Sequence, residues 1–141
     1  MLVLAESCTG GLIAGTITGV AGASSVLERG WVTYSNEAKQ EELGVDPAII
    51  DAHGAVSAET AAAMAAGALA HAPAPAQVAL SVTGIAGPGG GSAGKPVGLV
   101  WFGLARRGDG PPSTSSRVFS GDRAAVREAA IRRGLELLLG A

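Results

Sequence analysis

An apolar stretch that ends abruptly in small polar residues opens the chain and constrains its fold more than any other segment. Residues 2–5 read Leu-Val-Leu-Ala, and Glu-Ser-Cys-Thr-Gly-Gly follows directly. An apolar run without alternation, bounded by turn residues, is typical of a buried strand in a parallel sheet. Residues 12–23 are small and compatible with a helix. The pattern predicts a strand that leads into a helix, with Ser7, Cys8 and Thr9 at the carboxyl end of the strand and the start of the helix.

This junction is where a functional site is expected. Open α/β sheets bind ligands beyond the carboxyl ends of their strands. Helix N-termini carry unpaired N–H groups that hold anions and stabilise developing oxyanions. Ser7 is a candidate nucleophile that needs a base, and the alternative is a simple helix cap. Cys8 is the stronger nucleophile by type, but without a histidine nearby its pattern favours a buried packing residue.

The rest of the chain alternates between strand and helix patterns. Strands rich in β-formers are expected over 30–34, 77–82, 97–105 and 114–120, the last two as an antiparallel hairpin. Helices that begin at capping residues are expected over 35–43, 46–54 and 57–71 and from Asp122 to the end of the chain. We find no internal repeat and no linker. The pattern predicts one layered α/β domain over residues 1–141.

Composition narrows the classes of function. Hydrophobic residues make up 48% of the 141 residues and charged residues only 16%, which argues against disorder. A net charge of −2, with no basic run outside the last helix, disfavours nucleic-acid binding. The single cysteine excludes an internal disulfide, and no apolar run reaches the roughly 18 residues of a membrane span. We expect a soluble cytoplasmic protein that binds neither nucleic acid nor membranes.

Lys39, near the second predicted strand, is a candidate for the base that Ser7 needs. Lys39 follows Tyr34 by five residues, and both reach the sheet edge of Ser7 if the first two strands are neighbours. A partly desolvated lysine beside a tyrosine has a lowered pKa and can accept a proton from serine. The alternative is that Lys39 is a solvated lysine on a helix, because three glutamates lie nearby in the sequence. Spacing alone favours this alternative. His53 and His71 are expected to be solvated, and with one cysteine they form no metal cluster.

A glycine-rich loop over 83–95 contains two patterns known from phosphate-binding and hydrolase sites. In both cases the secondary structure that the motif requires is missing. Residues 89–95 match the start of a P-loop, but Pro96 and a strand follow in place of a hydroxyl residue and a helix. Residues 90–94 match G-x-S-x-G without the required strand-to-helix turn. The loop's N–H groups suit an anion, whereas the alternative is a flexible surface loop. Arg123 and Arg127 are candidates for holding a phosphate, or belong to a solvated helix face.

Four blocks of the chain together resemble one family. They are Ala5-Glu-Ser-Cys-Thr-Gly-Gly11, Glu28-Arg-Gly-Trp-Val-Thr-Tyr-Ser-Asn-Glu-Ala-Lys39, His53-Gly-Ala-Val-Ser57, and Thr83-Gly-Ile-Ala-Gly-Pro88 with Lys95-Pro-Val-Gly98. The chain resembles the C-terminal domain of the competence/damage-inducible protein CinA, a family that also occurs alone as nicotinamide-nucleotide amidohydrolase. Members usually carry a helix ahead of the first strand. We expect that helix to be absent here and an apolar sheet face to be exposed.

The resemblance implies a three-layer α/β/α sandwich with a mixed, partly parallel sheet, usually in a homo-oligomer, without metal or cofactor. It implies hydrolysis of the carboxamide of nicotinamide mononucleotide to nicotinic acid mononucleotide and ammonia. Ser7 becomes the expected nucleophile, and Tyr34 and Lys39 the expected proton-transfer groups. The expected substrate-binding residues are Cys8, Thr9, Gly10, Asn36, Thr83, Gly84, Gly87 and Arg123. Two competing hypotheses are a nucleotide-binding module without turnover and a hydrolase that uses Cys8.

Overall fold

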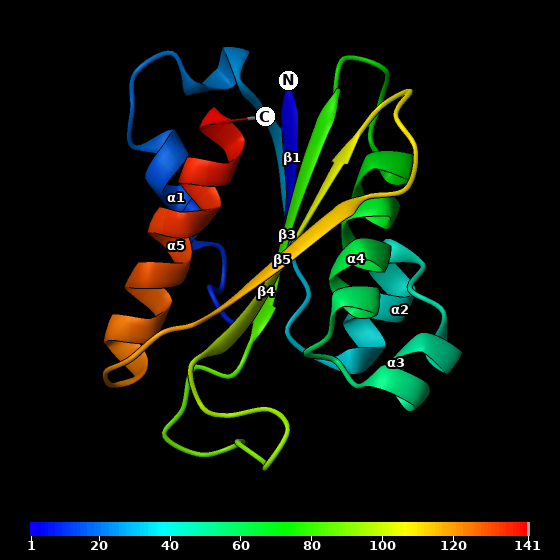
Figure 1. The fold of residues 1–141 in the computed structure, drawn as a ribbon. Coiled ribbons are helices and arrows are strands. Elements are labelled where there is room, and N and C mark those ends of the chain that lie inside the picture. Colours follow the sequence, from blue (N-terminus) through cyan, green and yellow to red (C-terminus); the bar gives the residue numbers. More distant parts are fainter. Residues whose placement is uncertain (141) are drawn as a thin grey trace.

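A five-stranded mixed sheet lies between two layers of helices in the computed structural model, which describes residues 1–140 (Figure 1). The strands are β1 (Leu2–Glu6), β2 (Leu27–Val32), β3 (Val78–Gly84), β4 (Leu99–Arg106) and β5 (Ser113–Val118). Their order in the sheet is β2-β1-β3-β4-β5. β1 pairs in parallel with β2 and β3, whereas β4 runs antiparallel to both β3 and β5. The predicted three-layer fold with a mixed, partly parallel sheet is confirmed.

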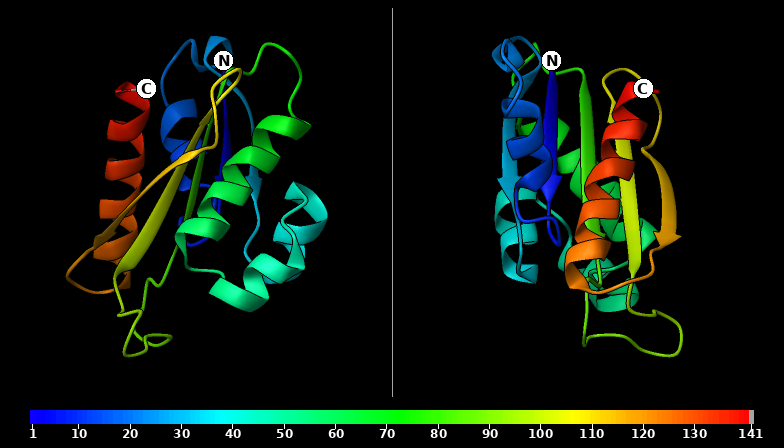
Figure 2. Two further views of the ribbon diagram at one scale, coloured as in Figure 1. Left: turned by 45° about the vertical axis from the view of Figure 1, so that its right-hand side comes forward. Right: turned by 90° about the vertical axis from the view of Figure 1, so that its left-hand side faces the viewer.

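The helices divide between the two faces of this sheet. They are α1 (Leu12–Thr18), the 3₁₀ turn η1 (Ala23–Ser25), α2 (Asn36–Leu43), α3 (Pro47–His53), α4 (Ala58–His71) and α5 (Arg123–Leu139). α1 and α5 cover one face, and α2, α3 and α4 lie on the other (Figures 1 and 2). On β1, Val3 and Ala5 join the core beneath α4, while Leu4 packs in the core beneath α1 and α5. Because the strand is buried on both faces, its apolar run does not alternate with polar residues.

Several element bounds differ from the sequence-based expectations. The first helix ends at Thr18 because Gly19 closes it, and Gly22 has a φ of 87° that a helix does not contain. β2 is shifted toward the N-terminus and stops at Val32, so Tyr34 lies in the connection to α2. Thr83 and Gly84, expected in a loop, are the last residues of β3. Tyr34, Thr83 and Gly84 still lie at the carboxyl ends of β2 and β3.

Within residues 1–140, apolar exposure on the sheet is confined to its edge strands, at Val32 on β2 and Val118 on β5. Helices cover the central strands on both sides, and β1 is buried from Val3 onward. The exposed apolar side chains include Val20 and Val26, in the segment that joins α1 to β2. None of the helices in the described part of the chain is long and apolar enough to cross a membrane.

Close packing of α2 on α4 depends on a glycine. A Cβ placed on Gly67 of α4 would lie 1.9 Å from the Leu43 carbonyl oxygen at the end of α2. We expect Gly67→Ala to lower the free energy of unfolding by about 3 kcal/mol, because backbone has to move. The matched control is Gly15→Ala in α1, where no atom lies within 4 Å of the added Cβ. That change is expected to raise stability by about 0.5–1 kcal/mol. Urea denaturation measures both, and equal effects would contradict this packing.

Candidate active site

Ser7 and Lys39 meet at the carboxyl end of the sheet. Ser7 follows β1 directly, and its N–H donates to the Val82 carbonyl of the neighbouring β3 at 2.9 Å. Ser35 caps α2 by accepting from the Ala38 N–H at 3.0 Å, which starts the helix so that Lys39 turns inward. The Lys39 ammonium nitrogen, Nζ, lies 3.1 Å from Ser7 Oγ. The structure therefore brings together two residues that are 32 positions apart in the chain.

Burial sets the electrostatics of Lys39. The side chain is only 1% exposed, and Nζ donates to the Thr33 carbonyl at 2.8 Å, with the carbonyls of Tyr34 and Ser35 at 3.5 and 3.4 Å. Desolvation lowers the pKa of Lys39 below its ordinary value, and no carboxylate forms an ion pair with it within residues 1–140. The population of neutral amine at physiological pH rises accordingly. A neutral amine within hydrogen-bond distance of a serine hydroxyl is able to accept its proton.

The start of α1 is occupied by a side chain of the chain itself. The Glu6 carboxylate, 1% exposed, accepts hydrogen bonds from the N–H groups of Gly11, Ile13 and Ala14 at 3.2, 3.0 and 2.9 Å. The prediction of an anion site at this helix start is therefore wrong, because the anion is Glu6. Sequence reasoning missed this role. The sequence feature that indicates this role is an acidic residue directly before a turn and a helix.

The turn between Glu6 and α1 presents fewer amides than expected. The Gly10 N–H donates to the Ser7 carbonyl at 2.9 Å, so it is not directed at a ligand. No oxygen atom within residues 1–140 accepts from the N–H groups of Cys8 and Thr9, although the Cys8 N–H lies against its own thiol. Arg127, a candidate for holding phosphate, instead donates to the carbonyls of Cys8 and Thr9 at 3.1 and 3.4 Å. It holds the turn in place.

A cavity of about 250 Å³ opens above Ser7 and Lys39. Predicted site residues that line it are Ser7, Cys8, Tyr34, Asn36, Lys39, Thr83, Gly84, Gly87 and Arg123. Thr9 and Gly10 do not line it, and the Thr9 side chain is fully buried. Lining residues that sequence reasoning did not assign are Ala55, Val56, Ile85, Ala86, Gly89 and Gly90. Their signal lay in two of the family-like blocks and in the glycine-rich loop.

Arg123 connects three parts of the cavity wall. It begins α5, and its guanidinium donates to the Gly87 carbonyl at 2.9 Å and to the Tyr34 hydroxyl at 2.7 Å. Tyr34 is 59% exposed, and Lys39 reaches its backbone carbonyl rather than its hydroxyl. The Tyr34 hydroxyl therefore lies on the side of Arg123, at the outer part of the site.

Cys8 sits beside Ser7 in a different electrostatic setting. The residue is 5% exposed, and desolvation by burial raises the pKa of its thiol to about 11. The thiol is therefore protonated at neutral pH, and the thiolate is the nucleophilic form of cysteine. This geometry favours Ser7 over Cys8 as the reactive group.

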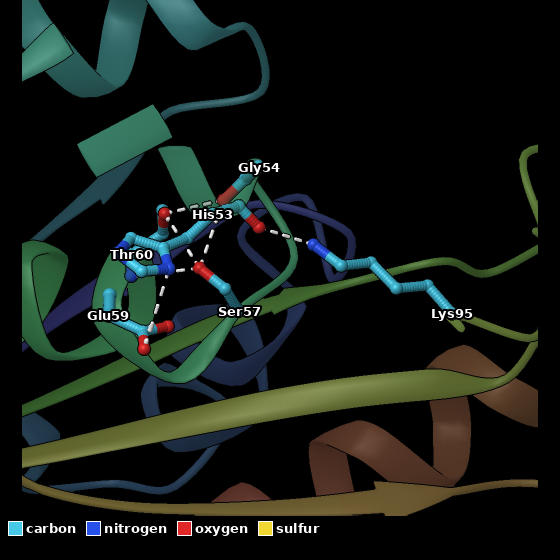
Figure 3. A network of polar contacts seen from close by, with 6 residues as sticks. All are labelled: His53, Gly54, Ser57, Glu59, Thr60 and Lys95. Atoms are coloured by element: carbon cyan, nitrogen blue, oxygen red, sulfur yellow. Dashed lines mark hydrogen bonds and ion pairs between the residues drawn. The ribbon is translucent and has the colours of Figure 1, made fainter. Parts of the chain in front are cut away.

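The far wall is a turn between α3 and α4 held by several hydrogen bonds (Figure 3). The Gly54 carbonyl accepts from the hydroxyls of Ser57 and Thr60 at 3.0 and 2.7 Å. The His53 ring lies 3.6 Å from the Glu59 carboxylate and does not line the cavity, and neither does His71. Among residues 1–140 no three His, Cys, Asp or Glu side chains gather to hold a metal ion.

Together, fold and site define a three-layer α/β protein in which a buried lysine contacts a serine hydroxyl at the carboxyl end of a partly parallel sheet. The family model of the CinA C-terminal domain matches residues 1–141. The chain belongs to the CinA C-terminal domain family.

Close relatives carry the name nicotinamide-nucleotide amidohydrolase PncC. The protein from Enterobacter agglomerans is 59% identical over 123 residues, which are 87% of this chain and 73% of that protein. The Escherichia coli K12 protein is 53% identical over 135 residues, or 95% of this chain and 79% of that protein. A putative competence-damage inducible protein of Caldicellulosiruptor bescii is also 53% identical, but this chain spans only 32% of it.

Solved structures agree with this membership. The crystal structure of competence/damage inducible protein CihA from Agrobacterium tumefaciens is 49% identical, with a TM-score of 0.93. The match covers 99% of this chain and 84% of that one. A CinA superfamily protein from Escherichia coli is 37% identical with a TM-score of 0.90, covering 98% and 78% of the two chains.

Proposed function

We propose that this chain hydrolyses the carboxamide of nicotinamide mononucleotide, giving nicotinic acid mononucleotide and ammonia, with Ser7 as the nucleophile. The observation that carries the proposal is the 3.1 Å contact between Ser7 Oγ and Nζ of the buried Lys39 at the floor of the cavity. The names of the relatives from Enterobacter agglomerans and Escherichia coli support the same activity. A serine with an adjacent desolvated amine is the arrangement that activates a hydroxyl for attack on an amide.

The proposed reaction has two halves with Lys39 as the proton carrier. Neutral Lys39 accepts the Ser7 proton as Oγ bonds to the amide carbon, and the resulting oxyanion lies near the N–H groups of Cys8 and Thr9. The C–N bond then breaks, and the Lys39 ammonium returns the proton to the departing ammonia. Water attacks the acyl–serine, with Lys39 again accepting and returning a proton. The sum is one amide and one water converted to one acid and one ammonia.

The part of the cavity away from Ser7 and Lys39 supplies polar groups that can bind the nucleotide. Arg123 is the cation that lines it besides Lys39, so we assign the phosphate to its guanidinium. Asn36 and the amides of the glycine-rich loop provide polar groups between the phosphate and Ser7. Under this proposal the protein needs no cofactor, and its cytoplasmic location and homo-oligomeric state stay predictions.

Ammonia release from nicotinamide mononucleotide tests the proposal directly. We expect turnover without added metal and in the presence of a chelator. Cys8→Ala distinguishes the two nucleophiles, since a Ser7 enzyme retains measurable turnover whereas a cysteine hydrolase loses it. Folded protein that binds the nucleotide without releasing ammonia would overturn the proposal in favour of a non-catalytic binding module.

A further inference from the structure

We propose that Lys95 is a positioning residue that fastens the glycine-rich loop across the mouth of the cavity and so sets the affinity for substrate. The inference rests on the proposed function, because the cavity is taken as the substrate site. Lys95 Nζ donates to the backbone carbonyl of His53, which joins the loop to the turn between α3 and α4 (Figure 3). Both segments line the cavity, the loop through Gly89 and Gly90 and the turn through Ala55 and Val56.

The turn is a rigid wall to which a loop can be fastened. Besides the two hydroxyls that hold the Gly54 carbonyl, the Gly54 N–H donates to the Ile50 carbonyl at 2.8 Å. The Ala55 carbonyl accepts from the Thr83 hydroxyl of β3 at 2.8 Å, which ties the turn to the sheet. The positions of Ala55 and Val56 are therefore determined without Lys95.

The loop, in contrast, has few anchors. Residues 88–94 are exposed, and the loop's internal hydrogen bonds join Ser92 to Lys95. Ala86 packs into the core at the start of the loop. Within the described residues, side-chain hydrogen bonds hold the loop beyond Ala86 to other segments at two points, Arg123 to the Gly87 carbonyl and Lys95 to the His53 carbonyl. Two cations thus hold the loop near its opposite ends.

Gly54 leaves room for this contact. A Cβ on Gly54 would lie 2.8 Å from Lys95 Nζ, and the residue has a φ of 79°, which glycine adopts readily. Without the Lys95 contact the loop samples more conformations, and binding has to order them again. The cost falls on substrate binding, because Ser7 and Lys39 are held by the sheet and α2 and do not depend on the loop.

The test compares substitutions at Lys95 with a control at its partner. Lys95→Met keeps the aliphatic stem but removes the donor, and we expect KM for nicotinamide mononucleotide to rise about three- to tenfold with kcat little changed. Lys95→Arg retains a donor and is expected to restore most of the affinity. His53→Ala is expected to leave KM unchanged, because Lys95 binds the backbone carbonyl and the exposed His53–Glu59 pair contributes little.

Hydrogen exchange provides a readout that does not depend on turnover. We expect the amides of Ser92 and residue 95, whose N–H groups donate to each other's carbonyls across the loop, to exchange faster in Lys95→Met than in wild type or His53→Ala. Unchanged exchange together with unchanged KM would overturn the inference. A loss of affinity for the nucleotide but not for its phosphate-free riboside would also overturn it, because Lys95 would then bind phosphate. Failure of the proposed function itself is distinct, since wild type would release no ammonia while the exchange comparison still applies.

Discussion

Replacement of Ser7 by alanine is expected to abolish ammonia release from nicotinamide mononucleotide, with a loss in kcat on the order of 10⁴-fold or more. The change removes the only atom that forms the proposed acyl–enzyme bond, whereas the proposal assigns nucleotide binding mainly to Arg123, Asn36 and the glycine-rich loop. We therefore expect the dissociation constant for the nucleotide to change by less than about threefold. Ammonia assays and calorimetric titration measure the two quantities on the same preparation.

Ser81 offers a control for the loss of a buried hydroxyl. It lies on β3, is fully buried and does not line the cavity. Its hydroxyl donates to the Ala61 carbonyl at 2.6 Å. Ser81→Ala is expected to lower the free energy of unfolding by about 1 kcal/mol. At temperatures where the variant stays folded, its rate of ammonia release is expected to match that of wild type. Turnover that survives in Ser7→Ala would contradict the proposed nucleophile.

Replacement of Lys39 by methionine is expected to lower kcat by about 10²- to 10⁴-fold, the usual contribution of a general base. Methionine has a similar length and suits a side chain that is 1% exposed, so the loss would reflect the amine rather than a cavity. Lys39→Arg keeps a positive charge but cannot accept a proton, and its kcat is expected to fall by a similar factor. An active Lys39→Arg enzyme would mean that charge, not proton transfer, is what Lys39 supplies.

The pH profile gives a further test of Lys39. Because the proposed mechanism requires the neutral amine, kcat/KM is expected to rise with pH as Lys39 loses its proton. Desolvation lowers the pKa of Lys39, so the midpoint of this rise falls below the ordinary lysine value of about 10.4. The limb is expected to disappear from the residual activity of Lys39→Met. A midpoint at the ordinary value, or a limb that persists in the variant, would assign the titration to another group.

Local chemistry made much of the fold predictable. The capping residues Ser35, Asp46, Ser57 and Asp122 each accept from an N–H two or three residues later, as their types predict. The apolar run at the start of the chain indicated a strand buried on both faces, and the family resemblance indicated many, but not all, of the residues that line the cavity. Such signals are readable because each depends on neighbours in the chain or on a motif that is itself contiguous.

The contacts between those segments were decided by tertiary structure. Spacing alone left Lys39 as a solvated lysine, and only the parallel pairing of β1 with β2 brings it to Ser7 and away from water. Arg123 reaches Tyr34 across 89 residues, and Lys95 reaches His53 across 42. The sequence by itself determined the elements and the chemical groups at their ends. The packing of distant elements determined which groups meet and which are desolvated, because distance and burial are properties of the folded chain rather than of any segment.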